Sequence, residues 1–138
     1  MIARPHSILL DAEALSLLAA GDRRIQAWLV VARRTDSTLH TSAVTLAETS
    51  DGTPRDARLR LAVKAVRVEP VTAAIGYSAG RLRTKAARAR RKLRDVTVDA
   101  LVAATALTLP RPPLVLTSDP SDLALLLAGA PVAVETIL

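Results

Sequence analysis

The segment SILLDAEALSLL, from Ser7 to Leu18, limits the possible folds of this chain more than any other stretch. Three apolar residues, Ile8 to Leu10, run directly into Asp11 and then into a helical pattern. Such a short continuous run is typical of a central parallel strand that is covered on both faces, and parallel sheets bind ligands beyond the carboxyl ends of their strands. Asp11 is therefore expected to point into a site, unless it only caps the helix that follows.

The rest of the chain continues this alternation of short apolar strands and helices. The alternation predicts one α/β domain over residues 1–138, with a central, mainly parallel sheet. At 138 residues the chain is long enough to bury roughly two-thirds of its unfolded surface in a single core. The strands expected after the first are 38–41, 66–71, 114–116 and 132–134.

The composition limits the kind of core, the site chemistry and the cellular location that can be expected of this protein. Half of the residues are apolar but the chain has neither Phe nor Cys, so the core must be aliphatic, and disulfides, zinc–thiolate sites and thiol nucleophiles are excluded. Too few apolar residues precede Asp11 for a secretory signal. The longest apolar runs, 100–109 and 123–134, are short or broken compared with the ~20 residues of a membrane span. We expect a cytoplasmic protein without a membrane segment.

Several helix starts can be predicted from residues that cap free N–H groups. Asp22, Ser42 and Thr72 are each expected to cap the helix that follows them. Thr97 is expected to cap a buried helix over 98–109, which leaves Asp95 as a solvated loop acid.

Four acids stand at comparable places in this predicted fold. Asp11 and Asp119 follow buried strands, Asp99 lies in the first turn of a buried helix, and Glu48 lies on an otherwise apolar helix face. Burying several ionised carboxylates together is unfavourable unless a cation neutralises them. A ligand set of hard oxygens without Cys or His favours Mg²⁺ or Mn²⁺. The alternative is that each acid has a separate structural role, as a first-turn acid, a turn residue or a helix tip.

Four segments, ILLDAEAL, TSAVTLAET, DVTVDALVAATAL and LVLTSDPSDL, resemble the acidic motifs of PIN-domain ribonucleases in their usual order. The third and fourth are the most specific, with an acid followed by an Ala-rich helix and the pattern Thr-x-Asp-x-x-Asp after a strand. The chain also has the length of a small VapC-type toxin of a type II toxin–antitoxin pair. The resemblance implies a three-layer α/β/α sandwich with a central, mainly parallel sheet.

The resemblance also implies roles for individual residues. Thr117 would orient the site through its hydroxyl, and Asp122 would be either an outer group of the site or the cap of the last helix. Leu123 departs from the family, in which an aromatic is common, and this change should affect packing alone. The catalytic and metal-binding acids would be Asp11, Glu48, Asp99 and Asp119.

The activity implied by the resemblance is Mg²⁺- or Mn²⁺-dependent endonucleolytic cleavage of RNA. The partners implied are an RNA substrate, a cognate antitoxin protein and a second copy of the chain in a homodimer. One alternative is a non-catalytic nucleic-acid-binding or regulatory module with the same fold. Another is a response-regulator-like phosphate-transfer domain, but such a domain needs a Lys after a late strand and none lies near Asp119.

The chain carries a net charge of +6, and eight Lys or Arg residues lie between Arg81 and Arg94. The predicted helix after Thr72 starts apolar and becomes basic from Arg81 onward, either within one helix or at a break near Gly80. This stretch either contacts nucleic-acid phosphates or forms a solvated face or a surface for an acidic partner. No aromatic residue interleaves with these charges, so base stacking is not expected. The predicted phosphate contacts are Arg81, Arg83, Lys85, Arg88, Arg91 and Lys92.

Overall fold

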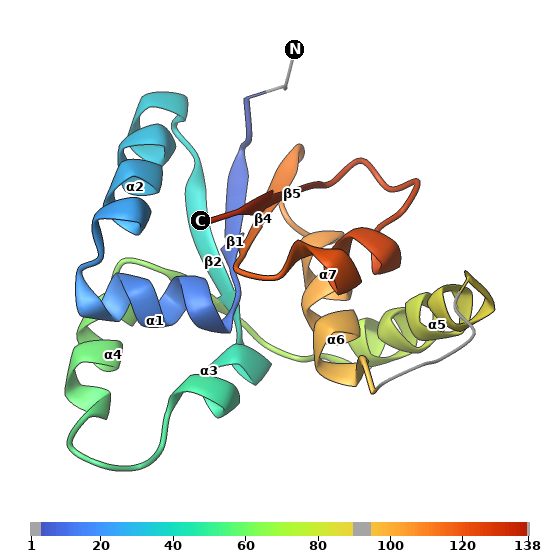
Figure 1. Ribbon diagram of the computed structural model, residues 1–138, viewed down its shortest axis with the longest axis horizontal. Coiled ribbons are helices and arrows are strands. Elements are labelled where there is room, and N and C mark those ends of the chain that lie inside the picture. Colours follow the sequence, from blue (N-terminus) through green and yellow to red (C-terminus); the bar gives the residue numbers. More distant parts are fainter. Residues whose placement is uncertain (1–3, 90–94, 138) are drawn as a thin grey trace.

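The computed structural model describes residues 4–89 and 95–137, in which a parallel sheet forms the centre of the molecule (Figure 1). The strands are β1 (Ser7–Leu10), β2 (Thr38–Ser42), β3 (Arg67–Glu69), β4 (Pro113–Thr117) and β5 (Ala133–Thr136). Their order is β3-β2-β1-β4-β5, and every neighbouring pair is parallel. The predicted α/β fold with a parallel sheet is confirmed.

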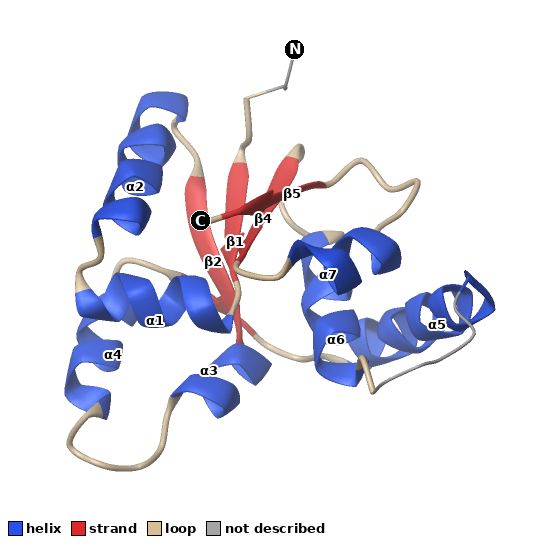
Figure 2. Ribbon diagram, viewed as in Figure 1, coloured by secondary structure: helices blue, strands red, loops and turns tan. Residues whose placement is uncertain are grey.

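Helices cover both faces of this sheet (Figure 2). One layer contains α1, α2 and α4, the other contains α5, α6 and α7, and the short helix α3 lies beyond the end of β2. This arrangement is the expected three-layer α/β/α sandwich. No helix in the described ranges is long and apolar enough to span a bilayer. The helices are α1 (Ala12–Ala20), α2 (Arg23–Thr35), α3 (Ala43–Thr49), α4 (Asp56–Val63), α5 (Ala73–Ala89), α6 (Thr97–Ala106) and α7 (Pro120–Leu126).

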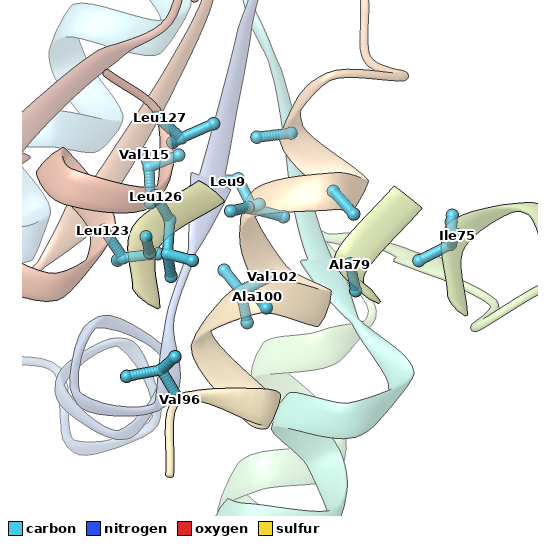
Figure 3. Close-up of a cluster of buried hydrophobic side chains, with 14 of the residues drawn as sticks. Leu9, Ile75, Ala79, Val96, Ala100, Val102, Val115, Leu123, Leu126 and Leu127 are labelled. Atoms are coloured by element: carbon cyan, nitrogen blue, oxygen red, sulfur yellow. The ribbon is translucent and has the colours of Figure 1, made fainter. Parts of the chain in front are cut away.

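Strand β1 lies in the middle of the sheet and separates the two cores. All four of its residues are at most 1 % exposed, as expected for a strand covered on both faces. Ile8 and Leu10 pack under α1 and α2, whereas Leu9 packs under α6 and α7. Figure 3 shows Leu9 and Val115 beside Ala100 of α6 and Leu123 of α7. Leu123 therefore has the packing role that was predicted for it.

The edge strand β3 is shorter than the predicted strand 66–71. It ends at Glu69, because Pro70 has no N–H group to continue the ladder. A buried side-chain bridge ties this short strand to β2. His40 is 2 % exposed, its Nδ1 lies 2.8 Å from Oε1 of Glu69, and its Nε2 lies 2.6 Å from Oγ1 of Thr38.

Most of the predicted helix starts are confirmed. The side chains of Asp22 and Ser42 accept hydrogen bonds from the first turns of α2 and α3, and Thr72 accepts one from the N–H of Ile75 in α5. The prediction for α6 was wrong. Thr97 is the first helical residue, and its N–H and hydroxyl both donate to Asp95, at 2.9 and 2.6 Å. Asp95 is exposed in the loop before α6, as predicted, and it also accepts these two hydrogen bonds at the helix start.

Helix α5 continues through Gly80 without a break as far as Ala89. Of the two arrangements predicted for the change from apolar to basic residues, the structure therefore has the single helix. Ile75, Ala79 and Ala86 are buried against the rest of the domain. The predicted phosphate contacts Arg91 and Lys92 lie outside the described residues.

The loop between α3 and α4 is closed by a buried carboxylate. Asp56 is 6 % exposed and accepts hydrogen bonds from the N–H groups of Asp51 (3.1 Å) and Gly52 (3.0 Å). These two bonds fix the path of the chain immediately after the helix that carries Glu48.

Asp56→Ala is expected to lower the free energy of unfolding by about 2 kcal/mol, because both N–H groups lose their acceptor inside the protein. Urea denaturation followed by circular dichroism measures this change. Asp56→Asn keeps one carbonyl acceptor and should lose less. Equal stability of Asp56→Ala and the parental protein would contradict a structural role for this carboxylate.

Candidate active site

The site is organised around the carboxyl ends of β1 and β4, where Asp11 leaves the sheet. Asp11 is both the residue after β1 and the cap of α1, since its Oδ1 accepts the N–H of Ala14 at 3.0 Å. The two roles considered for Asp11 are therefore compatible. The cap holds one carboxylate oxygen in place while the residue stays at the ligand-binding edge of the sheet.

Glu48 and Asp99 come to the same place from two different helices. Glu48 lies in the last turn of α3, and Asp99 lies in the first turn of α6. Partial burial raises the pKa of the Glu48 carboxyl, and the negative charges of Asp99 and Asp11 raise it further. The charges of two other predicted acids thus act on Glu48, although each lies 37 or more positions from it in the sequence.

Burial also raises the pKa of the Asp11 carboxyl, and the neighbouring charge of Glu13 adds to this effect. Hydrogen bonds from the Thr117 hydroxyl and the Ala14 N–H act in the opposite direction, because they favour the ionised carboxylate. Thr117 is the last residue of β4 and is 2 % exposed. The predicted orienting role of Thr117 is consistent with this contact to Asp11.

Asp119 lies at the same edge but its carboxylate is used by its own helix. It caps α7 by accepting from the N–H and the hydroxyl of Ser121, at 3.3 and 2.9 Å. Its backbone N–H donates to the Thr117 hydroxyl at 3.1 Å, which links it to the residue that contacts Asp11. Asp122 is in the first turn of α7 and 3 % exposed. The cap of the last helix is thus Asp119, and of the two roles predicted for Asp122 the cap was wrong.

The donor set fits a hard divalent cation with part of its water shell. Within residues 4–89 and 95–137, no group of three or more His, Cys, Asp or Glu side chains is arranged so that it could hold a metal ion. Mg²⁺ commonly keeps several waters and binds through one or two carboxylates, so it does not require such a cage. Burial is the main cause of the raised pKa of both Asp11 and Glu48, and the charges of Asp99 and Asp11 add to it at Glu48. A bound cation favours the ionised carboxylates and so opposes both effects.

The outer face of α5 forms a basic groove of about 640 Å³, lined by Tyr77, Arg81, Thr84, Lys85 and Arg88 together with two glycines. Lys85 already has a partner within the protein, because its Nζ donates a hydrogen bond to the carbonyl of Ala128 at 2.8 Å.

Two further features of α5 concern its basic residues. The charge of Arg83 contributes to a lowered pKa of Asp95, after the hydrogen bonds from Thr97. Tyr77 is 75 % exposed and lies in the groove, so an aromatic does accompany these charges. The spacing of Tyr77 four residues before Arg81 was the signal that could have identified it.

The chain is thus an α/β/α sandwich with acidic residues at the carboxyl edge of its parallel sheet. Comparison with known families agrees, since the family model described as PIN domain matches residues 8–121. The chain belongs to the PIN domain family. No curated protein matches the chain in sequence.

Solved structures with the same fold include chains of toxin–antitoxin complexes. A chain of VapBC2 from Rickettsia felis, bound to a promoter DNA fragment, has a TM-score of 0.73 at 14% identity, covering 94% of this chain and 98% of that chain. A chain of a toxin–antitoxin complex from Klebsiella pneumoniae has a TM-score of 0.68 at 23% identity, covering 95% of this chain and 98% of that chain. A chain of DNA-bound VapBC from Salmonella typhimurium has a TM-score of 0.68 at 16% identity, covering 96% of this chain and 98% of that chain. At these identities the similarity shows the fold.

Asp11→Asn is expected to stabilise the protein in EDTA at pH 7 but not at about pH 4, near the ordinary pKa of aspartate. A carboxyl whose pKa is raised by folding binds protons more readily in the folded state than in the unfolded state. Its contribution to the free energy of unfolding therefore falls as the pH rises from the ordinary pKa of aspartate through the raised pKa of the folded state. The amide removes this loss and can still accept the N–H of Ala14.

Chemical denaturation at the two pH values measures the effect, with Asp36→Asn as the control. Asp36 is an exposed aspartate with φ of 54°, a conformation that Asn also tolerates. A destabilised Asp11→Asn at pH 7 would show that the cap needs the full charge and that this gain outweighs the cost of burying the carboxylate.

Proposed function

We propose that this PIN domain is a Mg²⁺- or Mn²⁺-dependent endoribonuclease. The observation that supports this proposal best is that Asp11 and Asp99 lie close enough to Glu48 for their charges to raise its pKa. Each acid comes from a different element, so no local helix or turn requirement accounts for their being together. In a chain of this family, such a cluster is best explained by a bound cation.

Asp11, Glu48 and Asp99 would hold the ion through carboxylate oxygens, with Asp119 as a fourth acid of the same edge. A bound divalent cation supplies Lewis-acid chemistry, which makes water a better nucleophile and stabilises charge on phosphate oxygens. The Thr117 hydroxyl and the Ala14 N–H both hydrogen-bond to the Asp11 carboxylate, so Asp11 is oriented before any ligand binds. Asp122, buried in the first turn of α7, would act as an outer group of the site.

Hydrolysis with water as the nucleophile would leave 5′-phosphate and 3′-hydroxyl ends. This chemistry makes no use of the 2′-hydroxyl of RNA, so the choice of RNA over DNA depends on binding. The basic groove on α5 supplies cations for the phosphate backbone through Arg81 and Arg88. Tyr77 in the same groove offers a surface on which an unpaired base could stack.

We further propose that the protein is the toxin of a toxin–antitoxin pair and acts in the cytoplasm as a homodimer. The structures of similar fold that are toxin–antitoxin complexes support this role. Co-expression with the protein encoded immediately upstream, followed by co-purification and a growth assay, tests it. A chain that neither binds that protein nor slows growth would be a PIN domain with another role.

Asp99→Asn is expected to lower the single-turnover rate of RNA cleavage by at least roughly 100-fold, because the amide cannot replace the charge of the carboxylate. Its melting temperature in EDTA should be unchanged or higher, since the amide removes a charge that repels Glu48. Asp36→Asn is the control, as it makes the same chemical change at an exposed position.

A variant that is less stable and cleaves at the parental rate would remove Asp99 from the site. If the parental protein binds RNA without cleaving it in Mg²⁺ or Mn²⁺, the non-catalytic module is the better description.

The double variant Arg81→Ala/Arg88→Ala is expected to weaken RNA binding and to reduce the slope of log K against log salt by about one unit per lost phosphate contact. Fluorescence anisotropy at several salt concentrations measures both quantities. Arg33→Ala/Arg34→Ala is the matched control, because it removes the same charge from exposed positions on α2. Equal effects of the two pairs would mean that net charge, rather than the α5 groove, attracts RNA.

A further inference from the structure

Thr45 has a hydroxyl that the folded chain leaves without a partner. In the described part of the chain, its Oγ1 is the one buried side-chain nitrogen or oxygen without a hydrogen bond, and the residue is 0 % exposed. Other buried threonines are satisfied. Thr41 donates to the carbonyl of Leu10 at 2.9 Å, and Thr105 donates to that of Leu101 at 2.8 Å. A buried donor without an acceptor is unfavourable, so its presence on this helix requires a reason.

The location of Thr45 connects it to the acid site. Ser42 is the last residue of β2 and also the cap of α3, so the first turn of α3 lies directly beyond the carboxyl end of that strand. Thr45 belongs to this turn, and Glu48 follows three residues later. Side chains three positions apart are neighbours on a helix surface. Because helical side chains lean toward the N-terminus of their helix, this spacing places the Glu48 carboxylate within reach of the side chain of Thr45.

Glu48 has the complementary requirement. Among the described residues, its carboxylate accepts no hydrogen bond, and the carboxylates of Asp99 and Asp11 lie near it. Asp11, in contrast, is held by Ala14 and Thr117. An unused donor on Thr45 and an unused acceptor on Glu48 therefore lie on adjacent turns of one helix.

We infer that Thr45 is a positioning residue of the acid site, whose hydroxyl donates to the Glu48 carboxylate, directly or through one water, when that carboxylate binds a cation. This inference depends on the proposed metal-dependent function. The hydroxyl holds Glu48 in one orientation, in the way that the groups around metal ligands commonly do. A residue that served packing alone would not need the hydroxyl, since Val has nearly the same shape.

The test compares Thr45→Val, which removes the hydroxyl, with Thr45→Ser, which keeps it. Three quantities are measured for each: the melting temperature in EDTA, the Mn²⁺ dissociation constant by calorimetry, and the single-turnover rate of RNA cleavage. Thr45→Val is expected to melt at the same temperature or higher, to bind Mn²⁺ about tenfold more weakly and to cleave about tenfold more slowly. Thr45→Ser is expected to restore Mn²⁺ binding to within about threefold of the parental value.

Thr105→Val is the matched control, because it removes the hydroxyl of a fully buried threonine that has a partner in the core of α6. It should lower the melting temperature and leave the Mn²⁺ dissociation constant unchanged. Combining Thr45→Val with Glu48→Gln tests the pairing, since the loss of Mn²⁺ affinity from the valine should largely disappear when Glu48 is already an amide. Thr45→Ala replaces Thr45→Val if the valine variant does not fold.

Parental Mn²⁺ affinity in Thr45→Val would overturn the role of Thr45 and leave the proposed function standing. A valine effect that persists in full beside Glu48→Gln would overturn the pairing with Glu48. Absence of Mn²⁺ binding by the parental protein would instead overturn the metal-dependent function, and the role of Thr45 with it.

Discussion

The parallel pairing of β1 between β2 and β4 is the constraint on which the rest of the structure depends. Leu10 is in register with Thr41 of β2 and with Leu116 of β4, so the residues that follow these three emerge at the same level of the sheet. Those residues are Asp11, Ser42 and Thr117. A shift of one residue in either pairing would turn the side chains of that strand to the opposite face and separate Asp11 from Thr117. The hydrogen-bond ladder therefore positions the site as well as the core.

The site is arranged at some expense to stability. Burial raises the pKa values of Asp11 and Glu48, with added repulsion from Glu13 at Asp11 and from Asp99 and Asp11 at Glu48, which means that the folded state disfavours their charged forms. The hydrogen bonds from Thr117 and Ala14 offset part of this effect at Asp11, and the two aliphatic cores stabilise the fold around it. An acid cluster that weakens the ligand-free protein is the pattern expected of a binding site rather than of a structural device.

Elements that depend on local sequence were predicted well. The run Ile8 to Leu10 is fully buried, and the caps Asp22 and Ser42 act as expected, because burial of a short apolar run and capping of a free N–H involve neighbouring residues. Where two nearby residues could each cap the same helix, the sequence did not show which of them does so. Asp95 bonds to Thr97 at the start of α6. Asp119 rather than Asp122 caps α7, because the choice depends on backbone angles that composition does not encode.

The sequence by itself determined the type of fold and the residues available for chemistry, since alternation of apolar strands with capped helices and a shortage of His and Cys are properties of the chain alone. It placed Asp11, Glu48 and Asp99 at element ends but could not show that their charges interact. The tertiary structure decided that, because interaction between charges depends on separation and burial. It also decided that the hydroxyl of Thr45 has no partner, since an unsatisfied group is defined by everything packed around it and not by its neighbours in sequence.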